Sequence, residues 1–271
     1  MPELPEVETT RRGIASHLMG RIMTGAVVRA AKLRLPLTPD LPHQLAGQRI
    51  EAVERRGKYL LFECAGGTLL IHLGMTGHLR VVPLASPVGP HDRVDILLDD
   101  GNLLRLVDSR KFGTVLWLVG DPMAHPLLVA LGPEPLTESF TGSYLYTVSR
   151  GRAVAIKSLL MDNRVVVGVG NIYANEALFR AGVRPETPAG QLTQARCRRL
   201  ATAVKDVLAE AIELGGTTLQ EFVVNEERPG YFRLRLAVYD RAGEPCPGCG
   251  SPIRLSRLAG RATYWCASCQ R

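Results

Sequence analysis

The second residue, Pro2, becomes a catalyst if Met1 is removed, because it then carries a secondary amine at the N-terminus. A secondary amine condenses with a sugar aldehyde to give a cationic iminium, which withdraws electrons from the neighbouring carbons. The reference pKa of an α-amino group, roughly 7.7 to 8.0, leaves a neutral nucleophilic fraction near pH 7. Glu3 could transfer the protons. In the alternative interpretation, Pro2 and Pro5 only stiffen the start of a helix, where proline is tolerated.

Four cysteines near the end of the sequence have the spacing of a metal site. Cys246 and Cys249 form one C-x-x-C pair, and Cys266 and Cys269 form a second pair after sixteen intervening residues. Two such pairs provide the closed tetrahedral sulfur shell of structural zinc. Two disulfides are the alternative, but no secretion signal precedes them. The spacing therefore predicts one structural Zn²⁺.

Length and charge indicate the class of protein. With 271 residues the chain exceeds the usual size of one core, which favours two domains with a small appendage. Lys and Arg number 33 against 26 Asp and Glu, a net charge of +7 that favours nucleic acid as partner. No apolar run approaches the ~20 residues that span a bilayer, and the first twenty residues lack the apolar stretch of a signal peptide. We expect a cytoplasmic protein with no membrane partner.

The first half of the chain is expected to position Pro2 on a helix in front of strands. Residues 5–19 have helical spacing of apolar side chains and a glycine just past the end. Residues 58–64 and 68–73 flank one Gly-rich turn, and residues 94–98 and 103–107 flank another. Strands dominate up to about residue 120, which predicts a β-sandwich fronted by one helix.

The second half has helical periodicity. Residues 131–136 break the pattern and are typical of a hinge, and helices are expected at 153–162, 172–181 and 194–213. Residues 164–171 are apolar and punctuated by glycine just before a helix. This segment is either a tight turn between helices or a helix-loop-helix that holds a DNA phosphate at a helix N-terminus.

Together, these motifs resemble those of the bacterial formamidopyrimidine-DNA glycosylases, which are 8-oxoguanine DNA glycosylases and AP lyases. The resemblance lies in Pro-Glu-Leu-Pro-Glu-Val-Glu at 2–8, the Lys58 hairpin, residues 71–75, 108–113, 161–163, 167–173, 216–218 and 229–232, and the four cysteines. It implies an α+β multidomain fold. A β-sandwich with a leading helix would cover residues 1–130, a helix-two-turn-helix domain residues 131–232, and a zinc-ribbon β-hairpin finger residues 233–271.

The resemblance also implies an activity and the residues that perform it. The family excises 8-oxoguanine and formamidopyrimidines from double-stranded DNA, then nicks the strand by β,δ-elimination. Pro2 would attack the sugar C1′, expel the damaged base and form the iminium from which both phosphates leave. Glu3 would protonate the ring oxygen. Glu6 would help to hold the everted base or the terminal amine.

Further basic and polar residues acquire DNA-binding roles from the resemblance. Lys58, His72, Asn171 and Arg261 would hold the phosphates beside the lesion, with Lys58 and Arg261 also counted as catalytic, and Lys157 would bind DNA. From the sequence alone, Lys58 reads as a solvated lysine at a strand end. His72 reads as a core histidine. Zinc would act only structurally, by stiffening the hairpin that delivers Arg261.

Everting a base leaves a hole in the DNA stack, and three residues are implied to fill it. Phe112 would wedge between base pairs, Met75 would occupy the void, and Arg110 would offer donors to the orphaned cytosine. Without the resemblance, Met75 and Phe112 would be assigned to the core. The chain departs from the family pattern at residues 109 and 111, and in residues 223–228, which belong to the loop expected to close over the everted base.

Two rival functions are open at this stage. The endonuclease VIII type uses the same proline chemistry on oxidised pyrimidines, but its opening normally has Gly where this chain has Leu4. A non-catalytic DNA-binding protein could keep the zinc ribbon and the helix-loop-helix, but such a protein has no need of Pro2, Glu3 and Lys58 together. We expect a monomer, because the sequence contains no coiled-coil seam.

Overall fold

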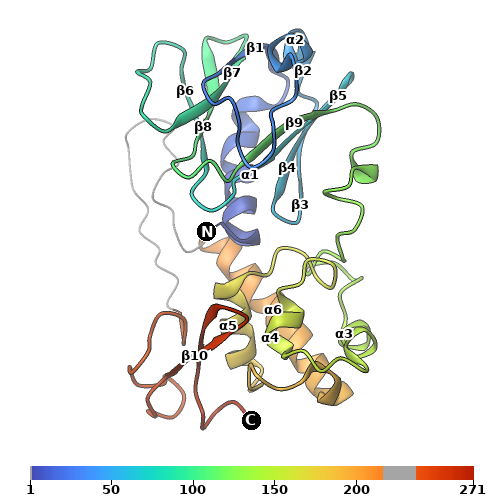
Figure 1. Cartoon of the computed structure of the whole chain (residues 1–271), viewed down its shortest axis with the longest axis vertical. Coiled ribbons are helices and arrows are strands. Elements are labelled where there is room, and N and C mark those ends of the chain that lie inside the picture. Colours follow the sequence, from blue (N-terminus) through green and yellow to red (C-terminus); the bar gives the residue numbers. More distant parts are fainter. Residues whose placement is uncertain (1, 216–235) are drawn as a thin grey trace. The chain divides into compact units, whose positions relative to one another are not determined.

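The computed structural model describes residues 2–215 and 236–271, which fall into two units (Figure 1). The first unit contains residues 2–129, and the second contains residues 130–214 and 236–271. The zinc-ribbon segment and the helices that precede it thus belong to the same unit. The break follows Val129, next to the predicted hinge.

Helix α1 (Leu4–Leu18) begins the first unit. Pro5 lies in the first turn, where its missing N–H costs no hydrogen bond. Val7, Ile14 and Leu18 are buried, as the helical spacing predicts. The helix packs these side chains into the core that the two sheets share.

The two sheets of the first unit form the predicted β-sandwich. Their strands are β1 (Ile22–Val28), β2 (Gln48–Arg49), β3 (Ala52–Arg56), β4 (Tyr59–Cys64), β5 (Gly67–His72), β6 (His78–Pro83), β7 (Asp92–Leu98), β8 (Asn102–Val107) and β9 (Thr114–Leu118). One sheet has the order β2-β1-β7-β8-β6 and the other β3-β4-β5-β9. The short helix α2 (Leu41–Leu45) lies between β1 and β2 in sequence, and a 3₁₀ turn (Pro122–Ala124) follows β9. Both predicted hairpins are confirmed, as antiparallel β4–β5 and β7–β8.

The second unit has a helical core with a hairpin. Its elements are α3 (Gly142–Ser149), α4 (Ile156–Leu160), α5 (Asn171–Arg180), a 3₁₀ turn (Ala189–Gln191), α6 (Gln194–Glu213), β10 (Arg254–Leu258) and β11 (Arg261–Trp265). Helix α6 has the predicted bounds, and Thr193 caps it by accepting a hydrogen bond from the Arg196 amide. No helix among the described residues is long and apolar enough to cross a membrane.

Two helices of this unit differ from the sequence prediction. Helix α4 is shorter than the predicted 153–162, because Ala155 has extended backbone and forms a β-bridge with Pro188. Helix α3 was not predicted, since its sequence Gly-Ser-Tyr-Leu-Tyr-Thr-Val-Ser is rich in residues with low helix propensity. Packing of α3 against α6 and a cap from the Thr141 side chain stabilise it.

Candidate active site and metal centre

The start of α1 brings together Pro2, Glu3 and Glu6. Glu3 is the N-cap, and its carboxylate accepts a hydrogen bond from the Glu6 amide. In return, the Glu3 amide donates to Glu6 Oε2 at 2.9 Å. Glu3 is only 1 % exposed and Glu6 9 %, while Pro2 is partly buried. The reciprocal bonds fix two carboxylates at the positive end of the helix dipole, directly after the proline.

A second cluster joins Lys58 and His72 through the β4–β5 pairing. Lys58 precedes β4, and Tyr59 pairs in register with His72, with ring centroids 4.8 Å apart. Burial, together with the nearby charges of Lys58 and Arg34, lowers the pKa of His72 to about 4. The Gly74 amide donates to His72 Nδ1 at 3.0 Å, so the neutral ring carries its proton on Nε2. His72 is therefore an uncharged donor beside two cations, and Arg34 is a neighbour that the sequence did not reveal.

The loops that carry Met75 and Phe112 are tied together by Asp108, which is fully buried. Asp108 Oδ1 accepts from the Thr76 hydroxyl at 2.7 Å and from the Arg110 amide at 3.2 Å. Its Oδ2 accepts from the Gly113 amide at 2.8 Å. One carboxylate thus fixes residues on both sides of the expected wedge. The sequence motif included Asp108 but did not indicate this role.

Close backbone packing also holds the two loops against each other. Gly74 has φ +66°, and a Cβ at this position would lie 2.4 Å from the carbonyl carbon of Phe112. Met75 and Phe112 are each 40 % exposed, although they are apolar. The Arg110 guanidinium lies 4.6 Å from the centre of the Phe112 ring. The structure thus brings together the three residues predicted to fill the DNA stack and leaves them accessible.

In the second unit, Lys157 supports the hairpin that carries Arg261. Lys157 is 1 % exposed, and its ammonium donates to the Ala262 carbonyl and to Thr263 Oγ1, both at 2.8 Å. The sequence predicted that Lys157 binds DNA. The structure places its ammonium against β11, and DNA binding by Lys157 stays a prediction. Arg261 itself is exposed at the start of β11.

Asn175 links the start of α5 to the same strand. Its Oδ1 accepts from the Tyr264 amide at 2.9 Å, and its Nδ2 donates to the Asn171 carbonyl at 2.5 Å. Asn171 Oδ1 is buried without a hydrogen-bond partner among the described residues. Glu176, also on α5, accepts from the amides of residues 237–239. Sequence reasoning missed Asn175 and Glu176, whose only signal is their polarity inside an apolar helix.

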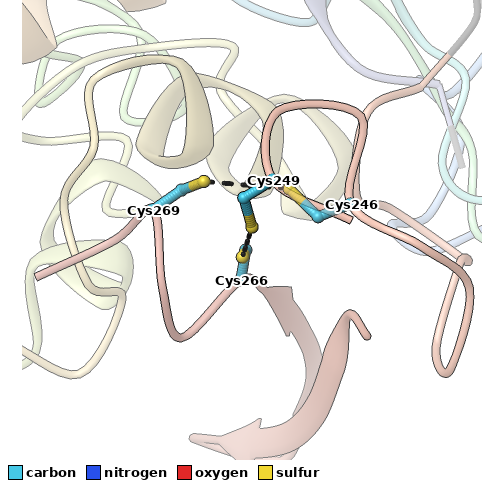
Figure 2. A group of neighbouring side chains, drawn as sticks. All are labelled: Cys246, Cys249, Cys266 and Cys269. Carbon is cyan, nitrogen blue, oxygen red and sulfur yellow. Dashed lines mark hydrogen bonds between the residues drawn. The ribbon is translucent and has the colours of Figure 1, made fainter. Parts of the chain in front are cut away.

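The four cysteines converge on one point (Figure 2). Their Sγ atoms all lie within 4.8 Å of one another; Cys246 and Cys269 are 3.8 Å apart, and Cys249 and Cys266 are 3.5 Å apart. Tetrahedral zinc with bonds of about 2.3 Å separates its sulfur ligands by about 3.8 Å, whereas a disulfide requires roughly 2 Å. The donor set therefore fits one structural zinc, and the disulfide alternative is wrong because all four thiols are unbridged.

Comparison with known proteins identifies the family. Residues 1–115 match the family described as formamidopyrimidine-DNA glycosylase N-terminal domain. Residues 131–223 match the formamidopyrimidine-DNA glycosylase H2TH domain, and residues 243–271 match the zinc finger found in FPG and IleRS. A formamidopyrimidine-DNA glycosylase from Geobacter sulfurreducens is 60 % identical over 271 residues, which is all of both chains. The chain belongs to the formamidopyrimidine-DNA glycosylase family.

Solved structures of formamidopyrimidine-DNA glycosylases have the same fold. The Lactococcus lactis enzyme in complex with DNA containing Fapy-dG is 32 % identical, with a TM-score of 0.89 over 99 % of this chain and 100 % of that one. A complex of the same enzyme with DNA containing an abasic site has 32 % identity and a TM-score of 0.90, with 99 % of each chain covered. The predicted family, fold class and zinc finger are confirmed, and the chain is a DNA glycosylase.

Proposed function

We propose that the chain excises oxidised purines, such as 8-oxoguanine and formamidopyrimidines, from duplex DNA and then cleaves the strand at the abasic site. The observation that carries the proposal is the start of α1, where Pro2 directly precedes the buried Glu3. Removal of Met1 would give Pro2 a nucleophilic amine next to a carboxylate held for proton transfer.

The chemistry at Pro2 involves two stages. Its nitrogen attacks C1′, the bond to the damaged base breaks, and the base leaves with the bonding electrons and a proton. Protonation of the ring oxygen by Glu3 opens the sugar and leaves an iminium between Pro2 and C1′. Loss of the C2′ proton then expels the 3′ phosphate, and a second elimination expels the 5′ phosphate. Glu6, which accepts a hydrogen bond from the Glu3 amide, would help to hold the everted base or the terminal amine.

The neighbouring residues of the first unit would hold the DNA in the required shape. Lys58 contributes charge, and His72 contributes a neutral N–H to a phosphate. Phe112 wedges into the stack, Met75 fills the void, and Arg110 donates to the orphaned cytosine. The exposure of Met75 and Phe112 supports this role, because apolar side chains without a partner would otherwise be buried.

In the second unit, Asn171 and Arg261 would bind the DNA phosphates beside the lesion. The contacts of Asn175 and Lys157 hold the start of α5 and the β10–β11 hairpin in one arrangement. Zinc on the four cysteines would crosslink the base of this hairpin and has no open position for chemistry. The loop expected to close over the everted base, near residues 217–230, lies outside the described residues.

Borohydride trapping tests this function. The protein is incubated with a duplex carrying 8-oxoguanine opposite cytosine and, in parallel, with one carrying an oxidised pyrimidine. A covalent adduct on the first duplex, lost in Pro2→Gly and weakened in Glu3→Gln, is the expected result. Adducts mainly on the pyrimidine duplex would indicate the endonuclease VIII type. Tight binding without an adduct, or an intact mass that retains Met1, would overturn the proposed mechanism.

The oligomeric state and the cellular location of the protein also remain to be tested. We propose that it acts as a monomer in the cytoplasm, on the chromosome, because one lesion needs one active site. Light scattering with and without a short lesion duplex measures the oligomeric state, and a mass of two copies on one duplex would contradict it.

A further inference from the structure

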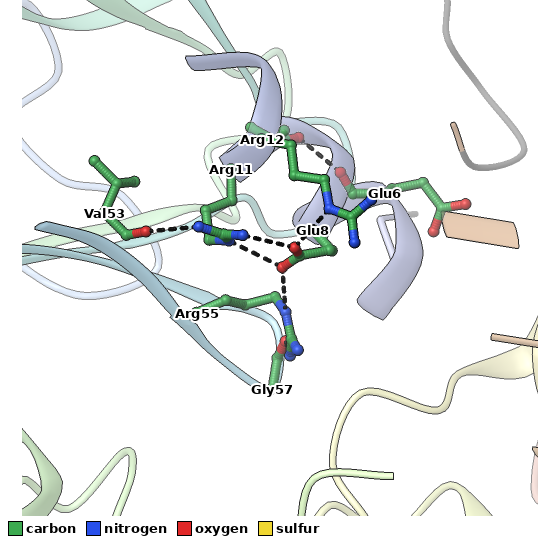
Figure 3. Close-up of polar contacts among 8 residues, drawn as sticks. Glu6, Glu8, Arg11, Arg12, Val53, Arg55 and Gly57 are labelled. Atoms are coloured by element: carbon green, nitrogen blue, oxygen red, sulfur yellow. Dashed lines mark hydrogen bonds and ion pairs between the residues drawn. The ribbon is translucent and has the colours of Figure 1, made fainter. Parts of the chain in front are cut away.

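Glu8 lies at the centre of an ion cluster on α1 that has no part in the chemistry above (Figure 3). Glu8 is 7 % exposed, and its two oxygens accept hydrogen bonds from three guanidinium groups. Arg11 donates to both oxygens at 2.8 and 3.0 Å, while Arg12 and Arg55 each donate to one at 3.0 Å. Burial alone would raise the pKa of Glu8, but these bonds lower it to about 2. The carboxylate is thus a fixed negative charge with its acceptor sites occupied.

Two of the three arginines continue from Glu8 to the backbone of the β3–β4 hairpin. Arg11 Nη1 donates to the Val53 carbonyl in β3 at 3.0 Å. Arg55 Nη1 donates to the carbonyl of Gly57 at 2.9 Å, and Gly57 is the turn residue directly before Lys58. Each arginine therefore bridges the Glu8 carboxylate and a main-chain oxygen. Figure 3 shows Glu8 between the helix and this turn.

The bridge is close to the reactive end of the helix. Glu8 is five residues after Glu3, which corresponds to about 7.5 Å along a rigid α-helix. Charge-assisted hydrogen bonds, and bidentate pairs above all, restrict geometry more strongly than neutral ones. The same carboxylate therefore fixes the position of α1, with Pro2 and Glu3 at its start, and of the turn that precedes Lys58.

We propose that Glu8 is a positioning residue, which through Arg11 and Arg55 sets the placement of Pro2 and Glu3 relative to Lys58. The inference rests on the proposed function, because it concerns the geometry of the iminium chemistry. A displacement of about 1 Å of a catalytic group can cost about a hundredfold in rate. Loss of the bridge is therefore expected to slow the covalent step while DNA binding, which depends on many other contacts, is retained.

The test compares Glu8→Gln and Arg55→Lys with Arg12→Ala as matched control. Arg12→Ala removes one ion pair from the same carboxylate but leaves both bridges to the hairpin; its side chain is already 52 % exposed. Arg55→Lys keeps a charge near Glu8 but replaces the two separate donor nitrogens, Nε to Glu8 and Nη1 to the Gly57 carbonyl, with a single ammonium nitrogen. Single-turnover borohydride trapping is measured on a duplex with an abasic site, and Kd is measured on a duplex with the stable tetrahydrofuran analogue.

We expect Glu8→Gln and Arg55→Lys to trap about 10- to 100-fold more slowly than wild type, with Kd changed less than threefold. Arg12→Ala should trap within twofold of wild type. Equal trapping rates in all four folded proteins would overturn the inference, as would a loss in Arg12→Ala as large as in Arg55→Lys. If Glu8→Gln does not fold, the trapping rate of Arg55→Lys tests the inference, because this variant keeps the Glu8 carboxylate with Arg11 and Arg12 bound to it. Failure of the wild type itself to trap would instead refute the proposed function.

Discussion

The low pKa of His72 predicts a specific dependence of stability on pH. Below its unperturbed pKa of roughly 6.5, an unfolded histidine binds a proton, whereas His72 in the folded chain stays neutral down to about pH 4. The unfolded state therefore binds more protons between these values, and the free energy of unfolding falls as pH drops through this window. The full effect is present above pH 6.5, and the loss is complete below pH 4.

The size of the effect follows from the difference in pKa. Each pH unit below 6.5 lowers the free energy of unfolding by about 1.4 kcal/mol. His72 should therefore lower it by about 2 kcal/mol between pH 7.5 and pH 5.0. His72→Gln should abolish this part of the pH dependence, even though the substitution itself lowers stability at both values. Because this loss of stability is the same at both pH values, it cancels when the free energies of one variant at the two pH values are subtracted.

The two tryptophans allow the measurement to be confined to the first unit. Trp117 is buried in the sandwich core and Trp265 lies in the hairpin of the second unit, so urea unfolding in a Trp265→Phe background reports on Trp117 alone. The exposed His43, whose side chain is 85 % accessible, provides the control variant His43→Gln, which should keep the wild-type loss. An equal pH-dependent loss in wild type and His72→Gln would refute the assignment of a neutral, partly buried His72.

Four further predictions concern the loops and the second unit. Phe112→Ala should slow single-turnover lesion excision about tenfold or more without loss of fold, because the ring is 40 % exposed; an unchanged rate would contradict the wedge. Gly74→Ala should lower the free energy of unfolding by roughly 1–3 kcal/mol in urea titrations, since its Cβ would lie 2.4 Å from the Phe112 carbonyl carbon. Lys157→Met should weaken DNA binding about tenfold, measured by fluorescence anisotropy, because the buried ammonium no longer holds the β10–β11 hairpin. An unaltered affinity would refute this supporting role. Removal of zinc by a chelator should reduce DNA binding strongly and leave the Trp117 unfolding midpoint unchanged; a shifted midpoint would contradict separate units.

Local patterns predicted the features that depend on neighbours in sequence. The bounds of α6, the two hairpins and the zinc spacing follow from periodicity, turn residues and paired cysteines. Helix α3 could not be predicted in this way, because its stability comes from packing against α6 and not from propensity.

The supporting residues of the site depend on partners far along the chain. Lys157 contacts Ala262, 105 residues away, and Glu8 meets Arg55, 47 residues away. A lysine or glutamate in an amphipathic pattern is normally solvated, so the sequence gives no sign of which one the fold will bury. The family resemblance supplied expected roles for Lys58 and His72, but the low pKa of His72 depends on its burial in the fold and on the positions of Lys58 and Arg34.

In the proposed role of Phe112 as a wedge, the Asp108 junction would determine which partner deforms when protein and DNA meet. Three hydrogen bonds and the close approach of Gly74 make the loops of Met75 and Phe112 a stiff body. If these loops stay rigid during the proposed insertion, most of the deformation would occur in the base stack of the DNA. The free energy of insertion would then vary with the deformability of the duplex and would be lowest at a weakly stacked or damaged pair. The buried carboxylate would in this way let the protein sense mechanical weakness in DNA before any base enters its active site.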